Sequence, residues 1–367
     1  MMNLPYAAQL ARKEKQVRIL LDKYGKVSPI IGMEYPYHYR NKVQAAFKPL
    51  RDGRVISGVY QSGTHHVVPV DSCLLEDETA DAIIVTIRSM LRAFKIAAYD
   101  EDSGRGVLRH VLVKRGFQSA EVMVVLVSAK PAFPSVHNFV KTLLDRHPEI
   151  TTVILNVNPY ATNLVLGPNE RVLYGKGYIE DALCGKIFRI SAKSFYQINP
   201  VQTEVLYGKA MEFADLNKTQ TAIDAYCGVG TIGLVASDFA GQVTGMELNR
   251  DAVRDAIANA KRNGVCNARF YCADAGDFMT AMAEAGETAD VLFMDPPRAG
   301  SSPAFLRAAA KLAPGRIVYI SCNSETQARD LAFLTKSGYK VRAIQPIDMF
   351  PHTNHVETVV LMSRADR

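Results

Sequence analysis

The stretch that decides the fold reads Thr-Ala-Ile-Asp-Ala-Tyr-Cys-Gly-Val-Gly-Thr at residues 221–231. An apolar run that contains Asp224 passes into a turn with Gly228 and Gly230, and a helical pattern follows. Glycine in such a turn lets a ligand approach the backbone at the start of the helix. Because the spacing departs from Gly-x-Gly-x-x-Gly, a dinucleotide site is the weaker interpretation.

From residue 191 onward, short apolar strands alternate with Ala-rich helical segments. This alternation predicts an α/β domain at 191–367 with a Rossmann-like, doubly wound parallel sheet, whose ligands bind beyond the carboxyl ends of the strands. The expected strands are residues 221–226, 242–247, 268–272, 291–295, 316–321, 339–349 and 356–362. Ahead of it, residues 1–190 predict a smaller α+β domain. Its expected helices are 6–24 and 76–94, and its expected strands are 42–47, 54–60, 66–70, 108–113, 121–127 and 152–157.

Three acidic residues stand at the ends of successive strands. Glu247 suits the two hydroxyls of a ribose, Asp274 suits an adenine amino group, and Asp295 faces the expected cleft. Taken singly, Glu247 or Asp274 is equally explained as the cap of the following helix. The ordered series that begins at Asp224 favours a ligand site, and it resembles that of class I S-adenosylmethionine-dependent methyltransferases.

Asp295, Cys322 and Glu357 mark a chemical site. Asp295 opens the segment Asp-Pro-Pro-Arg, in which the prolines make the turn rigid. Amino-group methyltransferases carry an aromatic residue after a similar turn, so Arg298 argues against amino methylation. Cys322 follows the next strand and precedes a helix, whose dipole favours the thiolate, although a lone cysteine at a strand end is more often structural. Glu357 belongs to the start of the last strand.

A cysteine, a carboxylate and a methyl donor together suit methylation of uracil at C5. That carbon becomes nucleophilic only after a thiolate has added to C6. Cys322 would make this addition, and Glu357 would remove the C5 proton after methylation. The alternatives are an amino-group methyltransferase and a non-catalytic RNA-binding protein, neither of which has a use for this pair.

The motif series resembles that of the RNA 5-methyluridine methyltransferases in order and spacing. The matching segments are Phe195-Tyr-Gln-Ile-Asn199, Asp224-Ala-Tyr-Cys-Gly-Val-Gly230, Asp295-Pro-Pro-Arg-Ala-Gly300, Ser321-Cys-Asn323, Asp348-Met-Phe-Pro-His352 and His355-Val-Glu357. The resemblance implies S-adenosylmethionine as methyl donor, Cys322 as nucleophile and Glu357 as base. The implied methyl-donor site is formed by Gln197, Tyr226, Gly228, Gly230, Thr231, Glu247, Asp274 and Asp295. Thr231 departs from the amide of some relatives.

Residues 349–357 resemble the members that modify 23S ribosomal RNA more than those that modify the T-loop of transfer RNA. We therefore expect 23S ribosomal RNA as the partner, with transfer RNA as the alternative. RNA cytosine-C5 enzymes also use a cysteine, but they commonly place it beside proline in a separate motif. Uracil is accordingly the better substrate.

Many ribosomal members of this family carry an RNA-binding barrel, the TRAM domain, and cysteines that hold a [4Fe-4S] cluster. In this chain neither the barrel nor the cysteine cluster precedes the segment at residues 3–13. Cys73 aligns with the fourth ligand of the cluster, which lies farther along the sequence than the other three. Because one cysteine cannot hold such a cluster, we expect no cluster and no other metal site in this chain as given. The retained Cys73 favours a natural start upstream of Met1.

The charge of the chain is concentrated near its beginning. Of 367 residues 48% are hydrophobic and 22% charged, which excludes a disordered or fibrous protein, and the net charge is +6. Residues 1–54 carry 11 Lys or Arg against 4 Asp or Glu. On charge alone an ordinary solvated helix face is slightly favoured, and a surface for RNA phosphates is the functional interpretation. The residues expected to contact RNA are Arg40, Lys42, Arg109 and Arg298.

Composition also bounds the location of the protein. No apolar run reaches the roughly 20 residues of a membrane span, and the first residues lack the apolar core of a signal peptide. The six cysteines show no paired spacing, as is usual in a reducing compartment. We therefore expect a cytoplasmic monomer that binds RNA and no membrane.

Overall fold

The structure is a computed structural model that describes residues 1–162 and 164–364. The chain divides into two compact units. The first unit comprises Met1–Pro36, Leu183–Phe188 and the chain from Ser194 onward, and the second comprises Tyr37–Ala182 and Arg189–Lys193. The sequence analysis placed residues 1–36 with the N-terminal domain, whereas their contacts lie in the first unit.

Within the described residues, the first unit is built on a seven-stranded sheet of order β12-β11-β10-β13-β14-β16-β15. The strands are β10 (Thr221–Ala225), β11 (Gln242–Glu247), β12 (Ala268–Cys272), β13 (Val291–Met294), β14 (Arg316–Ser321), β15 (Tyr339–Ile347) and β16 (Glu357–Arg364). The strands from β10 to β14 pair in parallel. This arrangement confirms the expected Rossmann-like methyltransferase fold.

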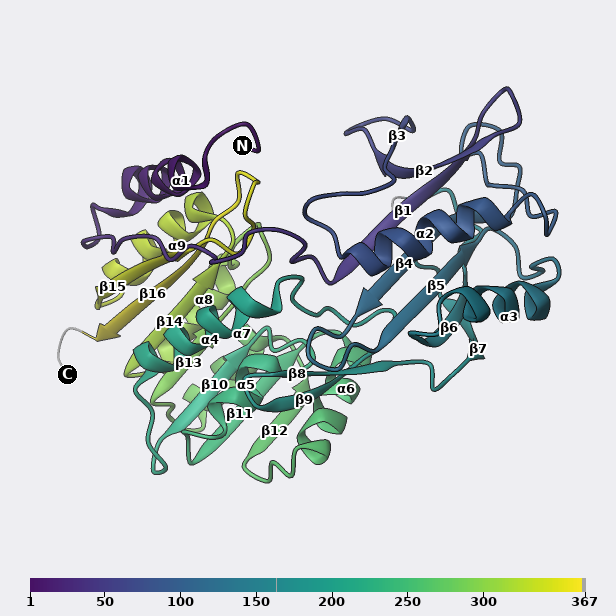
Figure 1. The fold of residues 1–367 in the computed structure, drawn as a ribbon. Coiled ribbons are helices and arrows are strands. Elements are labelled where there is room, and N and C mark those ends of the chain that lie inside the picture. The colour runs from purple at the N-terminus through teal and green to yellow at the C-terminus, as the bar shows by residue number, and fades with distance from the viewer. Residues whose placement is uncertain (163, 365–367) are drawn as a thin grey trace. The chain divides into compact units, whose positions relative to one another are not determined.

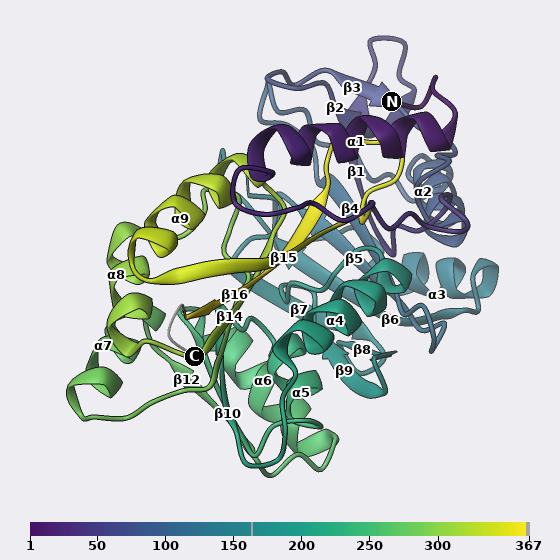
Figure 2. The same ribbon diagram turned by 90° about the vertical axis from the view of Figure 1, so that its left-hand side faces the viewer.

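Helices cover both faces of this sheet (Figure 2). On one face lie α4 (Pro200–Ala214), α5 (Thr231–Ala236) and α6 (Arg250–Arg262), and on the other α7 (Ala275–Glu284), α8 (Pro303–Leu312) and α9 (Ser324–Lys336). Side chains accept backbone N–H groups at the starts of α6, α7, α8 and α9. These caps satisfy donors that have no partner within the helix.

The N-terminal helix α1 (Tyr6–Leu21) packs beside α9 (Figure 1). Val17 and Leu21 are fully buried and belong to the same apolar core as Leu331 and Leu334 of α9. The spacing of the apolar residues thus predicted the helix, and its apolar side packs in the core of the first unit.

The last two strands differ from the expected parallel arrangement. β16 pairs antiparallel with both β14 and β15. The chain enters β15 at the edge of the sheet and returns through residues 348–356 into β16, which lies between β14 and β15. In this register Thr358 pairs with Ser321. The reversal therefore brings the start of β16 to the end of β14.

The second unit, within the described residues, contains a sheet of order β3-β2-β1-β4-β5-β6-β7. Its strands are β1 (Lys42–Pro49), β2 (Val55–Tyr60), β3 (Val67–Pro69), β4 (Leu108–Arg115), β5 (Val122–Ser128), β6 (Ile150–Val157) and β7 (Asn169–Tyr174). Helices α2 (Glu78–Met90) and α3 (Val136–Arg146) share one apolar core with one face of this sheet (Figure 1). The hairpin of β8 (Ile179–Leu183) and β9 (Lys186–Ile190) follows.

Among the described residues, no helix has both the length and the apolar character that crossing a bilayer requires.

Candidate active site

The turn after β10 has the backbone that its glycines suggested. Tyr226, Gly228 and Gly230 all have positive φ angles, of 65°, 55° and 82°. A Cβ atom at Gly230 would lie 2.9 Å from the ring of Phe270, so a side chain is excluded there. The Tyr226 ring lies 4.9 Å from that of Phe305 between centroids. The turn is therefore held in one shape at the carboxyl end of β10.

Glu247 ties this turn to the next strand. Its carboxylate accepts the backbone N–H of Gly228 at 3.2 Å and that of Asn249 at 2.8 Å, through different oxygens. Asp274 caps α7, because its Oδ1 accepts the N–H groups of Gly276 and Asp277. The cap interpretation thus applies to Asp274, although Oδ2 takes no part in the cap.

Asp224 is a buried acid beneath the same turn, with 1% of its surface exposed. Its Oδ2 accepts the Gly233 N–H at 2.7 Å, and its Oδ1 has no hydrogen-bond partner within the described part of the chain. Burial, together with the nearby Asp295 and Glu247, raises the pKa of Asp224 to about 8. Burial likewise raises the pKa of Asp295 to about 7.

These carboxyl groups form a region of negative potential at the strand ends. A cationic ligand would relieve the repulsion that raises the pKa of Asp224. S-adenosylmethionine carries a positively charged sulfonium, and its ribose hydroxyls are donors that suit a carboxylate such as Glu247. The residues present therefore fit the cofactor that the sequence predicted.

Two other predicted cofactor residues are Thr231, which begins α5, and Gln197. The Thr231 hydroxyl lies 3.0 Å from the hydroxyl of Tyr207, which is buried in α4. Gln197 is half-buried just ahead of α4, whose N-cap is Asn199. Thr231 thus orients Tyr207, while Gln197 remains a predicted cofactor contact.

Cys322 and Glu357 are brought together by the antiparallel register of β14 and β16. Cys322 is the first residue after β14, and Glu357 is the first residue of β16, with 6% of its surface exposed. Because Ser321 pairs with Thr358 at the end of the ladder, the antiparallel chains place Cys322 next to Glu357, whose charge acts on the thiol. The predicted nucleophile and base are therefore adjacent.

The turn after β13 is attached to the same place. The backbone carbonyl of Arg298 accepts hydrogen bonds from Asn323 Nδ2 at 3.1 Å and from Thr326 Oγ1 at 3.3 Å. The Arg298 side chain is exposed, and its charge lowers the pKa of the Cys322 thiol. Arg298 is thus a cation that acts on the predicted nucleophile.

The electrostatics of Cys322 differ from the expectation. The sequence analysis expected the α9 dipole to favour the thiolate, but the pKa of Cys322 is raised, first by burial and then by the charges of Glu357 and Asp295. Arg298 opposes this effect. The pKa of Glu357 is raised well above its usual value by burial and by Asp295. Burial of the thiol, reinforced by two carboxyl groups, thus outweighs the Arg298 charge.

A pocket of about 320 Å³ opens at Cys322, within the first unit. Its wall includes Arg298, the start of α9, and residues 354–356 just before β16. Gln16 and Leu20 of α1 complete it. The N-terminal helix therefore borders the predicted nucleophile, which the sequence analysis did not foresee.

A cluster of polar residues holds the segment that leads into Glu357. Lys13 Nζ lies 2.6 Å from Asp348 Oδ1 and donates to the Phe350 carbonyl at 2.9 Å. The Tyr6 hydroxyl donates to Asp348 Oδ2 at 3.0 Å. From α4, Gln202 Nε2 donates to the Asp348 carbonyl at 3.0 Å.

The sequence analysis missed these residues as contributors to the site. The available signal was the position of Lys13, four residues before Val17 and eight before Leu21, on the apolar side of the helix. A lysine on that side needs a buried partner.

The other predicted RNA contacts lie in the second unit. Arg109 is 2% exposed, and its guanidinium binds both carboxylate oxygens of Glu101 and the carbonyls of Asn158 and Tyr160. It therefore presents no free edge to a phosphate. Arg40 and Lys42 are half-buried, and burial and the Arg40 charge lower the pKa of Lys42.

Cys73 is half-buried, and its Sγ accepts the backbone N–H of Leu75 at 3.5 Å. In the residues that the structure describes, no group of three or more His, Cys, Asp or Glu side chains could hold a metal. The expectation that this chain as given holds no cluster stays a prediction.

Residues 5–365 match the tRNA (uracil-5-)-methyltransferase family. An uncharacterized RNA methyltransferase of Bacillus cereus (strain ATCC 10987) is 40% identical over 370 residues, which cover 100% of this chain and 80% of the relative. One from Oceanobacillus iheyensis is 42% identical over 363 residues, covering 97% and 79%.

The structure is also similar to that of Pyrococcus abyssi tRNA (uracil-54, C5)-methyltransferase in complex with S-adenosyl-L-homocysteine. The TM-score is 0.81 at 27% identity, over 98% of this chain and 84% of the other. The shared fold and the fitting acidic residues make S-adenosylmethionine the methyl donor. The chain is thus an S-adenosylmethionine-dependent RNA methyltransferase that belongs to the tRNA (uracil-5-)-methyltransferase family.

Proposed function

We propose that this chain methylates C5 of a uridine in 23S ribosomal RNA, with Cys322 as nucleophile and Glu357 as base. The proposal is carried by the adjacency of Cys322 and Glu357, at the end of the sheet where Asp295 also lies. The choice of 23S ribosomal RNA is supported by the resemblance of residues 349–357 to members that act on it. We propose further that the enzyme works as a cytoplasmic monomer.

The chemistry divides between the two residues. The Cys322 thiol gives its proton to solvent as Sγ forms a bond to C6 of uracil, and the electrons of the C5–C6 double bond move toward C5 and O4 as an enolate. S-adenosylmethionine, when bound, supplies the methyl group that C5 takes. Glu357 then accepts the C5 proton, the double bond re-forms, and the C6–Sγ bond breaks. Arg298 favours the thiolate in the first step and as the leaving group in the last.

The residues proposed to hold the methyl donor lie at the ends of β10, β11, β12 and β13, except Gln197, which lies just ahead of α4. They are Gln197, Tyr226, Gly228, Gly230, Glu247, Asp274 and Asp295, with Thr231 acting through Tyr207. The target base must leave its stack to reach the pocket at Cys322, which costs a few kcal/mol.

The nucleophile is tested with 5-fluorouridine-substituted 23S ribosomal RNA and S-adenosylmethionine. Fluorine at C5 cannot leave as a proton, so wild-type protein is expected to accumulate a covalent adduct, visible on a denaturing gel. Cys322→Ala should form none, and Cys266→Ser, at an exposed cysteine, should form as much as wild type. An undiminished adduct with Cys322→Ala would refute the mechanism.

The base is tested with unmodified RNA. Glu357→Gln is expected to methylate but to release RNA slowly, so the covalent complex should persist. Normal turnover in this variant would reassign the base.

The substrate is tested by incubating transcripts of 23S ribosomal RNA and of transfer RNA with the enzyme and labelled S-adenosylmethionine. Methylation of the 23S transcript alone is expected, and mass mapping then gives the nucleotide. Methylation of only the transfer RNA transcript would favour the substrate of the Pyrococcus abyssi enzyme instead.

A further inference from the structure

A second cavity, of about 670 Å³, lies within the second unit on one face of its sheet. On β1, Val43 and Ala45 belong to the core beneath α2 and α3, whereas Gln44 lines the cavity. On β4, Val111 belongs to that core and His110 lines the cavity. Since neighbouring side chains of a strand point to opposite faces, the cavity lies on the face that α2 and α3 leave uncovered.

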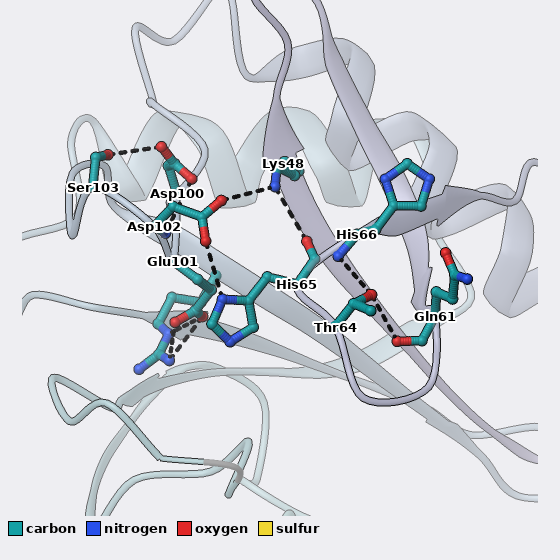
Figure 3. A network of polar contacts seen from close by, with 10 residues as sticks. Lys48, Gln61, Thr64, His65, His66, Asp100, Glu101, Asp102 and Ser103 are labelled. Carbon is teal, nitrogen blue, oxygen red and sulfur yellow. Dashed lines mark hydrogen bonds and ion pairs between the residues drawn. The ribbon is translucent and has the colours of Figure 1, made fainter.

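One wall of the cavity is the loop between β2 and β3, which a polar network holds in place (Figure 3). Lys48 Nζ donates to the His65 carbonyl at 3.2 Å and to Asp102 Oδ2 at 3.3 Å. The His65 ring lies 3.1 Å from Asp102 Oδ1, and Thr64 Oγ1 donates to the Gln61 carbonyl at 3.0 Å. The conformation of this loop is therefore stabilised by Lys48 and Asp102, which lie outside it.

Another part of the wall is formed by Thr162, Leu164 and Val165, which lie between β6 and β7. Asn158 Nδ2 donates to the Leu164 and Val165 carbonyls at 2.6 and 3.1 Å. Arg109 donates to the Asn158 and Tyr160 carbonyls and pairs with Glu101, which also lines the cavity. Arg109 was expected to bind RNA, and it acts instead as a support of this wall.

The groups that line the cavity are largely neutral. His110 is 5% exposed, and its Nδ1 has no hydrogen-bond partner among residues 1–162 and 164–364. Burial and the charge of Arg109 hold the pKa of His110 down to about 4, so its ring is neutral. The Tyr60 ring meets His110 edge-on at 5.9 Å between centroids and lies 6.3 Å from that of His65. Burial and Glu101 raise the pKa of Tyr60 to about 12.

The charges at the cavity are paired with one another. Glu101 is neutralised by Arg109, and Asp102 by Lys48. Asp100 also lies in this network and accepts from Ser103 (Figure 3). A phosphate in the cavity would meet the Glu101 carboxylate, and the guanidinium of Arg109 is already committed to that carboxylate. A flat, neutral ligand with both donors and acceptors on its edge suits the neutral imidazole, the phenol and the Gln44 amide.

We propose that this cavity binds one unpaired nucleobase of the substrate RNA, other than the uracil that is methylated. The inference rests on the proposed function, because it takes the RNA substrate from there. The cavity shares no lining residue with the pocket at Cys322. Proteins that recognise single-stranded RNA place splayed bases against aromatic rings and hydrogen-bond their edges, as Tyr60, His65 and His110 are placed to do. The second unit would then select the RNA segment that the first unit methylates.

The test measures the affinity of the catalytically inert Cys322→Ala protein for the RNA that wild type methylates, with 23S ribosomal RNA as the first probe. Tyr60→Leu and Gln44→Ala, each added to this background, are expected to weaken binding by about tenfold, the usual effect of losing one stacked or edge-bonded base. Tyr60→Phe keeps the ring and should retain most of the affinity. His66→Ala is the matched control, since His66 is exposed in the same loop but does not line the cavity.

Kinetics and cross-linking complete the test. In the active enzyme, Tyr60→Leu should raise KM for RNA and leave kcat unchanged at saturating RNA, with unchanged melting of the protein. RNA that contains 4-thiouridine or 6-thioguanosine should cross-link to a peptide with Tyr60 or His65 on irradiation. Unchanged affinity in both cavity variants, or cross-links only elsewhere, would overturn the proposal.

Titration with free nucleosides distinguishes a base within RNA from a free nucleoside as the ligand of the cavity. Adenosine, guanosine, cytidine and uridine are titrated while the imidazole of His110 is followed by nuclear magnetic resonance. A response to a nucleoside, with RNA affinity unaffected by Tyr60→Leu, would mean a small-molecule site and would overturn the proposal. Affinity and cross-linking are read in inert protein, so a failure of the methylation mechanism is distinguishable from a failure of this site.

Discussion

Lys13 and Asp348 form an ion pair in which both side chains are fully buried, with 2.6 Å between Nζ and Oδ1. The pair joins α1 to the segment that ends at Glu357, although 335 residues separate the two partners in sequence. Burial lowers the pKa of Lys13, and Asp348 partly restores it. The charged form of Lys13 is thus stabilised by Asp348. Because both side chains are buried, the pair fixes the position of α1 relative to residue 348.

Lys13→Met is expected to lower the free energy of unfolding by about 3–5 kcal/mol, because it leaves the Asp348 carboxylate buried without its cation. Lys15→Met, at an exposed position on the same helix, should change it by no more than about 0.5 kcal/mol. Urea unfolding followed by circular dichroism measures both. Equal stabilities would show that the ion pair contributes nothing. If Lys13→Met does not fold, Asp348→Asn, which keeps the shape of the side chain, should show a loss of the same sign.

Arg298 and Glu357 are expected to shift the reactivity of Cys322 in opposite directions. Arg298 lowers the pKa of the thiol and Glu357 raises it. Arg298→Met should therefore slow the alkylation of Cys322 by iodoacetamide at pH 8, and Glu357→Gln should speed it, each by about three- to tenfold. Mass spectrometry of the Cys322 peptide measures the rates, and the exposed Cys266 in the same samples is the internal control. Changes of the same sign in both variants would contradict this account.

The sequence predicted the parallel strands closely, because each is a short apolar run between glycine or polar turns. The expected residues 242–247 and 268–272 coincide with β11 and β12. Strand direction could not be predicted for β16, since an apolar run looks the same whichever way it pairs. The adjacency of Cys322 and Glu357 depends on that direction, so the sequence suggested the two residues and only the fold explains why they meet.

Other features depended on tertiary contacts that a sequence pattern does not contain. The basic residues of α1 suggested an RNA-binding face, yet Lys13 among them is buried against Asp348. Arg109 carries a charge that Glu101 neutralises. Helix α3 was not among the predicted elements. In each case the residue type was visible, and its partner was not.

His110 should make the protein less stable in acid. Its pKa is about 4 when folded and about 6.5 when unfolded, so between these values the unfolded chain binds a proton that the folded chain does not. Stability is therefore lost as pH falls from 6.5 toward 4, by up to about 3 kcal/mol. The difference in unfolding free energy between wild type and His110→Gln, measured by urea titration at pH 7.5, 6 and 5, should change in favour of the variant as pH falls. A constant difference would show that His110 titrates normally.

Binding of S-adenosylmethionine near pH 7 should release protons, and more of them than binding of S-adenosylhomocysteine. The pKa values of Asp295 and Asp224, about 7 and 8, leave both groups partly protonated at that pH. A cation beside them favours their ionised forms and lowers both pKa values, whereas the thioether of the product carries no such charge. Both ligands displace water alike, so the difference in the number of protons that they release reports the effect of the sulfonium charge. Isothermal titration calorimetry in buffers of different ionisation enthalpy counts the protons. Equal proton release by the two ligands would mean that the sulfonium does not act on these carboxyl groups. If the sulfonium does act on them, Asp295→Asn should reduce the difference in proton release between the two ligands.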